Sequence, residues 1–269
     1  MDIIRENKRD DNEIRMKIRE DVMKKKRKLS YIVAVIAMML LIIVILLTSF
    51  QIAIYGDREY RFYREEYEKY QVADSLSMEM EDIMDVTDKM MAYLIGEREE
   101  LSVITQVEGR EQDFFNEQDR FHMGEVKELF LGGLRVRNFL FGIVAALLVL
   151  LYLWKADLGS VLPGAYFVSL AVFGVLTAVL GGFMASNFNK CFTIFHKIFF
   201  DNDLWIFDPE KDYMIRMLPE GFFFDFVLRI GSFFAGGLVV FGILAGGWTV
   251  WSRRCRTAGT FTKAGSFPE

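Results

Sequence analysis

Four long apolar segments constrain this chain more than any other feature, because strongly charged stretches separate most of them. The segments run over residues 31–55, 138–154, 161–184 and 230–251, and none has an ionisable side chain near its centre. About 20 consecutive apolar residues span the hydrocarbon core of a bilayer as a helix. We therefore predict an all-α polytopic membrane protein with four transmembrane helices and a mostly helical extracytoplasmic cap.

The first apolar segment differs from a cleavable signal peptide. Its run over residues 31–55 is far longer than the apolar core of such a peptide, which has about 7–15 residues, and no clear Ala-x-Ala site follows it. We therefore expect this segment to remain in the protein as an uncleaved anchor.

Basic residues near the spans predict the orientation. The sequence KKKRK stands just before the first span and SRRCR follows the last, while Lys155 lies between the second and third. Lys and Arg are enriched in cytoplasmic flanks. We therefore expect both termini in the cytoplasm, with a charged arm (1–30), a short loop (155–160) and a tail (252–269).

The two segments predicted outside are acidic. Residues 56–137 carry 11 Lys and Arg against 21 Asp and Glu, and residues 185–227 carry 4 against 7. Nucleic-acid-binding surfaces are basic, so this layout argues against a nucleic-acid partner. We assign residues 56–137 and 185–229 to the extracytoplasmic side.

The first outer segment has helical periodicity. Ser77 is a candidate N-cap and Gly96 a candidate helix end, while Asn116 is a candidate cap for a helix that continues into the second span. No strand pattern of useful length is present. Two apolar stripes carry the periodicity: Tyr60, Tyr63, Tyr67 and Tyr70, and then Ile83, Val86, Met90 and Leu94.

The second outer segment is rich in aromatic residues. Eleven of the 26 Phe lie between Phe183 and Phe226, interleaved with acids and turn signals such as Asp208-Pro209. Aromatic side chains gather where lipid meets water. We therefore expect this segment to lie at the lipid headgroup level.

Several classes of protein lack support in the sequence. Ion-coupled carriers generally need ionisable side chains inside the membrane, and the spans have none near their centres. Serine-hydrolase, P-loop, zincin and paired Cys-x-x-Cys motifs are also missing.

Two histidines remain as candidates for chemistry. His122 and His196 are the only ones in the sequence, and each lies in an outer segment near a membrane edge. Imidazole is the natural general base near neutral pH. Glu125 follows His122 on the same helical face, where it either orients the ring or forms an ordinary surface pair.

Two other chemistries stay open at this point. A metal site could combine both histidines with Asp201, Asp203 or Glu125, although no compact ligand spacing is present. Cys191 could be a nucleophile, but a buried apolar cysteine is the favoured interpretation.

Three motifs together resemble one known family. The sequences FHKIFFDNDLWIFDPEKDYMIRMLPEGFFFD, FHMGEVKELF and MMAYL are similar to those of the lipoprotein intramolecular transacylases of low-GC Gram-positive bacteria. The resemblance covers about residues 31–252. In one position the chain departs from the family pattern, since Glu125 stands where an Asp is expected.

This resemblance implies a reaction at the cell membrane. The enzymes of this family move the sn-2 acyl chain of a diacylglyceryl-Cys lipoprotein onto its α-amine, at the outer leaflet. The implied partners are the lipoprotein N-terminus and membrane lipids, and no cofactor or metal is implied. A non-catalytic membrane adaptor or receptor and a metal-dependent membrane hydrolase are the alternative functions.

The resemblance also implies roles for particular residues. His122 and His196 would divide the roles of base and acid, in an order that the sequence leaves open. The supporting residues would be Glu125, Asn202, Asp203, Trp205, Asp208 and Tyr93. Oxyanion donors stay open among Asn187, Asn189, Asn202, Trp205 and backbone amides.

Overall fold

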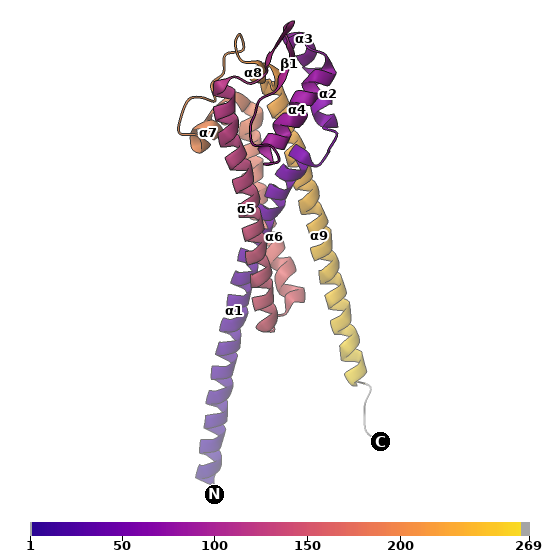
Figure 1. The fold of residues 1–269 in the computed structure, drawn as a ribbon. Coiled ribbons are helices and arrows are strands. Elements are labelled where there is room, and N and C mark those ends of the chain that lie inside the picture. Colours follow the sequence, from indigo (N-terminus) through magenta and orange to yellow (C-terminus); the bar gives the residue numbers. More distant parts are fainter. Residues whose placement is uncertain (1, 265–269) are drawn as a thin grey trace. The chain divides into compact units, whose positions relative to one another are not determined.

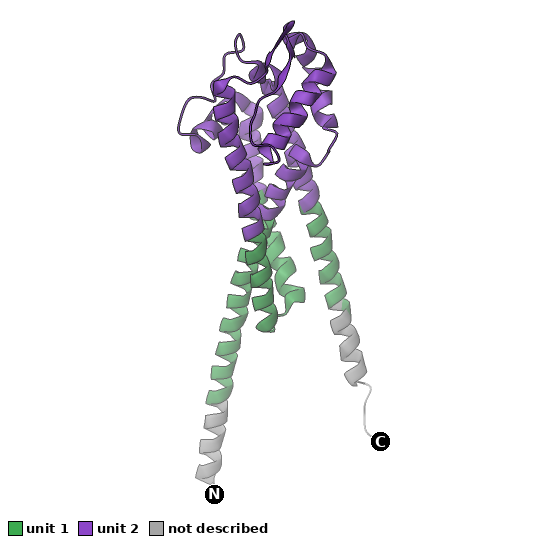
Figure 2. Ribbon diagram, in the orientation of Figure 1, with its two compact units in different colours: residues 1–42, 140–173, 238–269 green, residues 43–139, 174–237 purple. Residues whose placement is uncertain are grey.

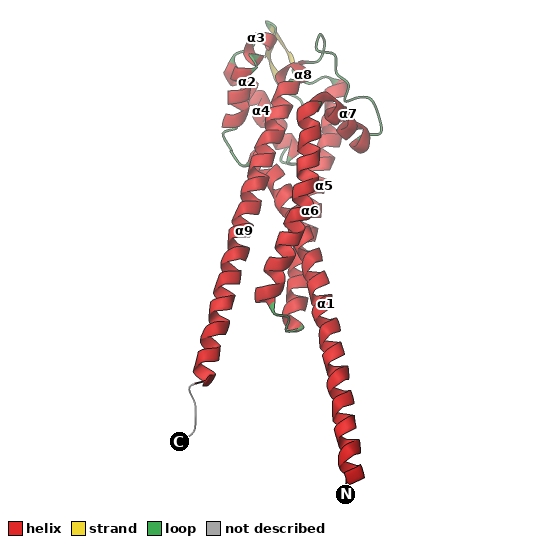
Figure 3. Ribbon diagram, turned by 180° about the vertical axis from the view of Figure 1, so that it is seen from behind, coloured by secondary structure: helices red, strands yellow, loops and turns green. Residues whose placement is uncertain are grey.

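The structure is a computed structural model, which describes the backbone of residues 2–264 and the side chains of residues 14–252 and 254. Helices make up most of this part, and one short hairpin joins them (Figures 1 and 3). The elements are α1 (Asp2–Tyr55), α2 (Arg61–Lys69), α3 (Val72–Leu76), α4 (Met80–Leu94), β1 (Ile104–Val107), β2 (Arg110–Asp113), α5 (Glu117–Leu153), α6 (Leu158–Ser186), α7 (Phe188–Phe199), α8 (Tyr213–Met217) and α9 (Glu220–Ala264).

Four helices among the described residues are long and apolar enough to cross a membrane. They are α1, α5, α6 and α9, and each contains one predicted span, except that the second span ends one residue beyond α5. This confirms the predicted fold class of a four-span helical membrane protein. The residues at which each helix enters and leaves the lipid stay predictions.

The chain divides into two compact units, coloured separately in Figure 2. Unit 1 comprises residues 1–42, 140–173 and 238–269. Small side chains let its helices approach closely, as is usual in membrane bundles. Ala34, Ala37 and Ala165 are fully buried around Tyr166, whose hydroxyl donates a hydrogen bond to the Leu238 carbonyl at 2.5 Å.

Unit 2 comprises residues 43–139 and 174–237 and contains α2–α4, the hairpin, α7 and α8. Its core is rich in aromatic and Met side chains. Tyr63 and Tyr67 of the predicted stripe are buried, and the Tyr67 hydroxyl bonds with Thr87 at 2.9 Å. The predicted apolar face of α4, from Ile83 to Leu94, is buried as well.

The ends of α4 show one wrong prediction and one confirmed prediction. The N-cap of α4 is Glu79, whereas Ser77 is the C-cap of α3 with φ 49°. The sequence did not reveal that Ser77 ends the preceding short helix, α3, rather than starting α4. Gly96 follows α4 with φ 84°, a left-handed conformation that ends a helix at little cost for glycine.

The hairpin β1–β2 was not predicted. Its strands have four residues each, too few for a visible alternation, and they pair antiparallel with Val107 opposite Arg110. The two turn residues, Glu108 and Gly109, both have positive φ, 55° and 74°. Two such residues form the turn that suits the twist of a hairpin.

Both ends of the chain carry predictions that the structure leaves open. The side chains of residues 1–13 in the predicted cytoplasmic arm lie outside the described residues, as do most of those in the predicted tail, Cys255 among them.

Candidate active site

His122 lies in the part of α5 that precedes the predicted span at residues 138–154. The start of this helix is fixed by a reciprocal pair of hydrogen bonds. The backbone amide of Asp119 donates to Asn116 Oδ1, and the amide of Asn116 donates to Asp119 Oδ2, both at 2.9 Å. This capping arrangement confirms Asn116 as the cap and sets where His122 stands on the helix.

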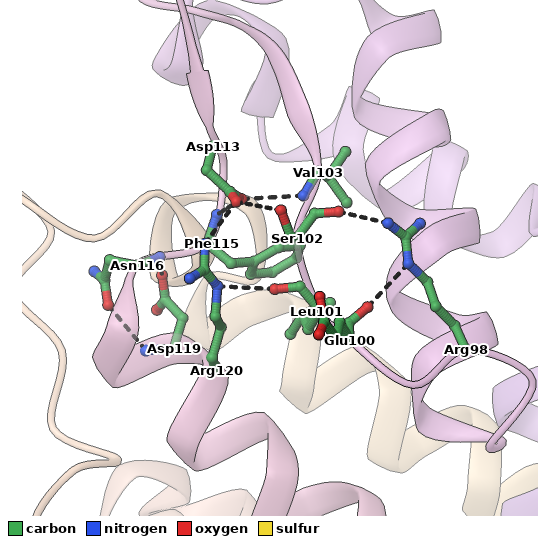
Figure 4. Close-up of polar contacts among 10 residues, drawn as sticks. All are labelled: Arg98, Glu100, Leu101, Ser102, Val103, Asp113, Phe115, Asn116, Asp119 and Arg120. Carbon is green, nitrogen blue, oxygen red and sulfur yellow. Dashed lines mark hydrogen bonds and ion pairs between the residues drawn. The ribbon is translucent and has the colours of Figure 1, made fainter.

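A polar network ties the start of α5 to the chain that precedes it (Figure 4). We call Arg98, Ser102, Asp113 and Arg120 the collar. Arg120 donates to the Leu101 carbonyl at 2.9 Å and to Asp113 at 2.5 Å, and Asp113 also accepts from Ser102 Oγ at 2.5 Å. Because these residues come from three segments, the network holds one turn of α5 in place next to His122.

The second histidine lies on α7. The Asn187 side chain caps this helix by accepting a hydrogen bond from the Lys190 amide at 3.0 Å. His196 points inward and is buried, whereas Ile194, Ile198 and Phe199 are exposed. The helix is therefore amphipathic, which agrees with the expected headgroup-level position of this segment.

Cys191 also lies on α7, and here the favoured interpretation was wrong. Its side chain is a free thiol of intermediate exposure rather than a buried apolar residue. The reason is that α7 buries its histidine side, while Cys191 falls on a partly open part of the helix.

The structure brings the two histidines together. Their ring centroids are 5.8 Å apart with the ring planes tilted by 30°. Both residues are buried, with 5% exposure for His122 and 7% for His196. Two imidazoles from distant parts of the sequence thus lie side by side in the buried interior of unit 2.

Aromatic rings enclose the pair. Phe200 and Phe207 contact the His122 ring at centroid distances of 4.9 and 5.5 Å. Trp205 stacks on His196 at 4.7 Å with an interplanar angle of 29°. From the sequence, the Phe-rich segment was expected only to lie at the headgroup level, so Phe200 and Phe207 were missed as neighbours of His122. Their positions in the FHKIFFDNDLWIFDP motif were the available signal.

One hydrogen bond fixes the tautomer of His196. Its Nδ1 lies 2.8 Å from the Phe192 carbonyl oxygen, one helical turn earlier. A carbonyl oxygen only accepts, so Nδ1 carries the proton. The other ring nitrogen, Nε2, is therefore left as a proton acceptor in the neutral ring.

Burial makes both rings hard to protonate. Burial, followed by the proximity of His196, lowers the pKa of His122 to about 4. Burial also lowers the pKa of His196, although its hydrogen bond to the Phe192 carbonyl raises that pKa in part. Both imidazoles are therefore neutral near pH 7, the state in which they can accept a proton.

Glu125 lies beside His122, as the helical spacing predicts. Its Oε2 is 3.9 Å from His122 Nδ1, too far for a hydrogen bond. Its Oε1 accepts a hydrogen bond from Asn202 Nδ2 at 2.8 Å. Asn202 thus joins the site by holding the carboxylate of Glu125, a contact that links α5 to the loop after α7.

Unpartnered polar atoms concentrate at this site. Among the described residues, five buried side-chain nitrogen and oxygen atoms have no hydrogen-bond partner. Three of them are His122 Nδ1, Glu125 Oε2 and Trp205 Nε1. Buried polar groups are normally paired, so three open atoms in one place indicate a site that a ligand completes.

A shallow depression of about 500 Å³ reaches this region from the surface. Its residues are three apolar side chains, two carboxylates and one glycine, namely Phe121, Leu129, Phe199, Glu125, Glu128 and Gly124. Glu125 is shared between the depression and the neighbourhood of His122. The arrangement suits a ligand with both apolar and cationic parts.

Three predicted supporting residues lie elsewhere in unit 2. Asp203 is an exposed loop residue whose carbonyl accepts a turn hydrogen bond from Ile206. Asp208 closes a turn through the Glu210 amide and pairs with Lys211 at 3.1 Å. These contacts give both acids structural roles in the loop.

Tyr93, the third of these residues, packs on α5. Lys127 Nζ lies 4.1 Å above its ring centroid. A Cβ added at Gly124 would lie 3.4 Å from the Tyr93 hydroxyl. Tyr93 therefore supports the helix that carries His122.

The metal alternative lacks a ligand set. Within the described side chains, no group of three or more His, Cys, Asp or Glu residues is placed to hold a metal ion. Glu125, one of the three acids considered as a third ligand, contacts Asn202 and stands 3.9 Å from His122 Nδ1. This geometry offers a zinc ion no ligand set.

The chain is similar to known proteins in its sequence pattern and in its fold. A family model described as lipoprotein intramolecular transacylase Lit matches residues 35–223. The solved structure of the membrane integral lipoprotein intramolecular transacylase Lit from Bacillus cereus is similar, with 23% identity, a TM-score of 0.66, and coverage of 85% of this chain and 98% of that chain. No curated protein matches.

Two variants of the Bacillus cereus protein are also similar in fold. In one a histidine is replaced by arginine, with 22% identity, a TM-score of 0.68, and coverage of 88% of this chain and 99% of that one. In the other the replacement is alanine, with 23% identity, a TM-score of 0.65 and the same coverages.

Proposed function

The chain belongs to the lipoprotein intramolecular transacylase family, and from this premise we propose that His122 and His196 carry out its acyl transfer. The protein is thus a multi-pass membrane acyltransferase that acts on lipoproteins, and the adaptor and hydrolase alternatives are set aside. The observation that carries the assignment is the meeting of the two buried histidines, whose ring centroids are 5.8 Å apart.

The reaction moves an acyl chain within one substrate molecule. The α-amine of the lipidated Cys attacks the sn-2 ester carbonyl, and a C–N bond forms. The bond from the carbonyl carbon to the glyceryl oxygen then breaks, and that oxygen takes a proton. Because an ammonium and an ester become a neutral amide and an alcohol, each turnover releases one proton to the solvent.

His196 is the better base of the pair. Its Nε2 is free to accept because the Phe192 carbonyl holds the proton on Nδ1 at 2.8 Å. The pKa of His122, lowered to about 4 by burial and by His196, makes that ring a weaker acceptor. His196 therefore takes a proton from the attacking nitrogen, and that proton reaches the glyceryl oxygen by way of His122, so both rings are neutral again at the end of the turnover.

Glu125 prepares this site for a cationic substrate. Its Oε2 is buried, unpartnered and 3.9 Å from His122 Nδ1, while Asn202 holds its Oε1. An ammonium at Oε2 would lie next to the histidine pair. Holding amine and ester of one molecule close together is itself a large contribution to the rate.

The surroundings of the site suit the outer leaflet. Ile198 and Phe199 of α7, Ile206 of the following loop and Phe121 of α5 are exposed apolar side chains in unit 2. Buried in lipid, such side chains would bring the depression to the level of the ester groups. Together with the basic flanks of the spans, this supports cytoplasmic termini and an active site at the outer leaflet.

The test of the reaction uses purified protein and a synthetic diacylglyceryl lipopeptide in mixed micelles. Substrate and product are isomers, so intact mass does not distinguish them. Mild alkaline hydrolysis removes both ester-linked chains from the substrate but leaves the amide-linked chain on the product. Tandem mass spectrometry should then find one acyl chain on the peptide nitrogen, and its absence with well-folded protein would refute the proposed reaction.

A crossover experiment tests that transfer stays within one molecule. Two lipopeptides of different peptide sequence are mixed, one with deuterated acyl chains. Each peptide should keep its own chain on nitrogen. Scrambled products would show that the chain acts between substrate molecules instead.

The orientation is tested with single cysteines in a cysteine-free variant. Glu111 in β2 is exposed and belongs to the predicted outer segment. A cysteine at this position should react with a membrane-impermeant maleimide on intact cells, whereas a cysteine at Lys24 should react only after lysis. The reverse pattern would invert the proposed topology.

A further inference from the structure

Acyl transfer places a negative charge on the carbonyl oxygen of the ester, and neither of the two histidine roles stabilises that charge. When the amine attacks, the carbonyl becomes a tetrahedral oxyanion, which needs a positioned hydrogen-bond donor. A buried donor that has no partner in the free protein is the natural candidate. The side-chain N–H groups around the histidine pair can be compared on this basis.

The asparagines named as candidate oxyanion donors all have side-chain contacts in the structure. The Asn187 side chain caps α7, and Asn189 Nδ2 donates to Glu220 at 3.2 Å. Asn202 Nδ2 donates to Glu125 at 2.8 Å. Donation by Asn189 or Asn202 to the substrate would break such a contact, and Asn187 is an exposed residue at the start of α7 rather than a buried donor.

Trp205 differs from them. Its Nε1 is buried and has no hydrogen-bond partner, although an indole N–H can only donate. Its ring stacks on His196 at a centroid distance of 4.7 Å. The indole N–H therefore belongs to a ring that stacks directly on His196, the proposed base.

The backbone around Trp205 is held on both sides. Gln118 Nε2 of α5 donates to the carbonyl oxygens of Leu204 at 3.1 Å and Ile206 at 3.0 Å. The Leu204 amide donates to Asn202 Oδ1 at 2.9 Å. These contacts fix the indole in advance, as an effective oxyanion donor requires.

Besides Trp205 Nε1 and His122 Nδ1 of the pair itself, Arg229 Nε is a buried side-chain nitrogen without a partner among the described residues. Its guanidinium carbon lies 4.4 Å from the Phe62 ring centroid and 5.4 Å from that of Phe233, and neither ring touches the histidine pair. Arg229 therefore belongs to a different neighbourhood.

We propose that Trp205 is a catalytic residue whose indole Nε1 donates a hydrogen bond to the oxyanion formed at the sn-2 ester carbonyl. In the tetrahedral intermediate the former carbonyl oxygen carries the negative charge and Nε1–H binds it. When the bond to the glyceryl oxygen breaks, the oxygen returns to a carbonyl, now of the amide. The proposal rests on the proposed transacylation and adds the group that stabilises its charged intermediate.

The test compares Trp205→Phe with wild-type protein and with the matched control Trp251→Phe, an exposed residue of α9. Loss of a single oxyanion donor lowers kcat by about 10²–10³-fold. We expect that loss for Trp205→Phe with little change in KM, because the N–H acts on the intermediate rather than on the bound ester. Trp251→Phe should keep the wild-type kcat.

A second variant separates donation from packing. Replacing Trp205 with benzothienylalanine exchanges the N–H for sulfur while the fused ring stays the same size, so stacking on His196 is kept. This variant should lose as much kcat as Trp205→Phe. A kcat within twofold of wild type for the benzothienylalanine variant would overturn the proposal. This readout stands even if Trp205→Phe fails to fold.

The chemical nature of the substrate gives a third readout. A thionoester at sn-2 produces a sulfur anion, which accepts hydrogen bonds weakly. Wild-type protein should therefore prefer the oxygen ester strongly, and Trp205→Phe should lose most of that preference. Equal preference in both would overturn the proposal, while wild-type protein inactive on the oxygen ester would overturn the proposed function and this inference with it.

Discussion

Two polar clusters of unit 2 flank the start of α5 and differ in how fully they are bonded. In the collar, both carboxylate oxygens of Asp113 accept hydrogen bonds, from Val103, Phe115, Ser102 and Arg120. In the open cluster, which we define as His122, Glu125 and Trp205, each residue has a buried atom without a partner. A fully hydrogen-bonded cluster stabilises the fold, whereas a cluster with unpartnered atoms is one that a bound ligand would complete.

The difference matters because unpaired buried groups are costly. A buried donor or acceptor without a partner destabilises a fold by about 1–3 kcal/mol. Three such atoms at one place therefore reduce stability unless a ligand pairs with them. The comparison predicts that changes in the open cluster affect activity most, and changes in the collar affect stability most.

The largest expected effect is on the histidines. His196→Ala and His122→Ala should each lower kcat by about 10²–10⁴-fold, because general acid–base catalysis contributes that much. The measurement is the rate of amide formation on the synthetic lipopeptide. Lys197→Ala, an exposed neighbour on α7, is the matched control and should leave the rate unchanged. Wild-type rates in both histidine variants would remove the pair from the mechanism.

Glu125 should rank next. Hydrogen bonds to charged groups contribute about 1.5–3 kcal/mol, so Glu125→Gln should lower kcat/KM by about 10- to 100-fold. Glu128→Gln is the control, since that carboxylate lines the depression but pairs with Arg135 in the structure. If both variants lost activity equally, the depression as a whole would bind the ammonium rather than Glu125.

The pH dependence of stability tests the open cluster through the titration of His122. Burial and the neighbouring His196 lower the pKa of His122 from 6.5 to about 4, so the unfolded chain binds a proton more readily between these values. Stability should therefore fall as the pH drops from about 6.5 to about 4. The loss is on the order of 3 kcal/mol if the group behaves independently.

Unfolding in detergent, followed by circular dichroism between pH 7 and pH 4.5, checks this prediction. The His122→Gln variant has no titrating group at this position, so its stability should fall less over the same range. The difference between the two curves isolates His122 from the carboxylates. Parallel curves would mean that His122 titrates alike in the folded and unfolded chain.

The collar should show the opposite pattern. Asp113→Ala removes the acceptor of several hydrogen bonds and should lower stability by about 1–3 kcal/mol. Well below its melting temperature, the variant should keep kcat within a few fold of wild type, because Asp113 does not contact the histidine pair. A kcat loss as large as that of Glu125→Gln would show that the collar takes part in catalysis.

The smallest effect is expected at Asp203. This residue belongs to the recognised motif, but it is an exposed loop residue with no shared contact with the histidines among the described residues. Asp203→Asn should change neither melting temperature nor kcat by a measurable amount, within about twofold for the rate. A strong loss of activity would place Asp203 in contact with the substrate.

The sequence determined the membrane fold because hydrophobic length is a one-dimensional property. Twenty apolar residues in a row span the bilayer whatever lies around them, so four spans could be counted directly. The face of α4 and the cap at Asn116 were also local features, set by residues three or four positions apart. The hairpin β1–β2 was missed because four-residue strands carry no detectable alternation.

The site required the tertiary structure because its contacts join distant parts of the chain. The histidines could be named from the sequence, but their 5.8 Å separation depends on how α5 and α7 pack. Neither the Asn202–Glu125 bond nor the stacking of Trp205 on His196 has any periodic signal. Asp203 and Asp208 show the converse, since they share the motif yet make their contacts within the loop.

Which groups stay unpaired was decided by tertiary structure alone. A sequence lists donors and acceptors, but whether each finds a partner depends on every neighbour at once. His122 Nδ1, Glu125 Oε2 and Trp205 Nε1 are open only because the packing that buries them supplies no partner. The sequence thus determined where the chain crosses the membrane, and packing decided where it keeps polar atoms free to act.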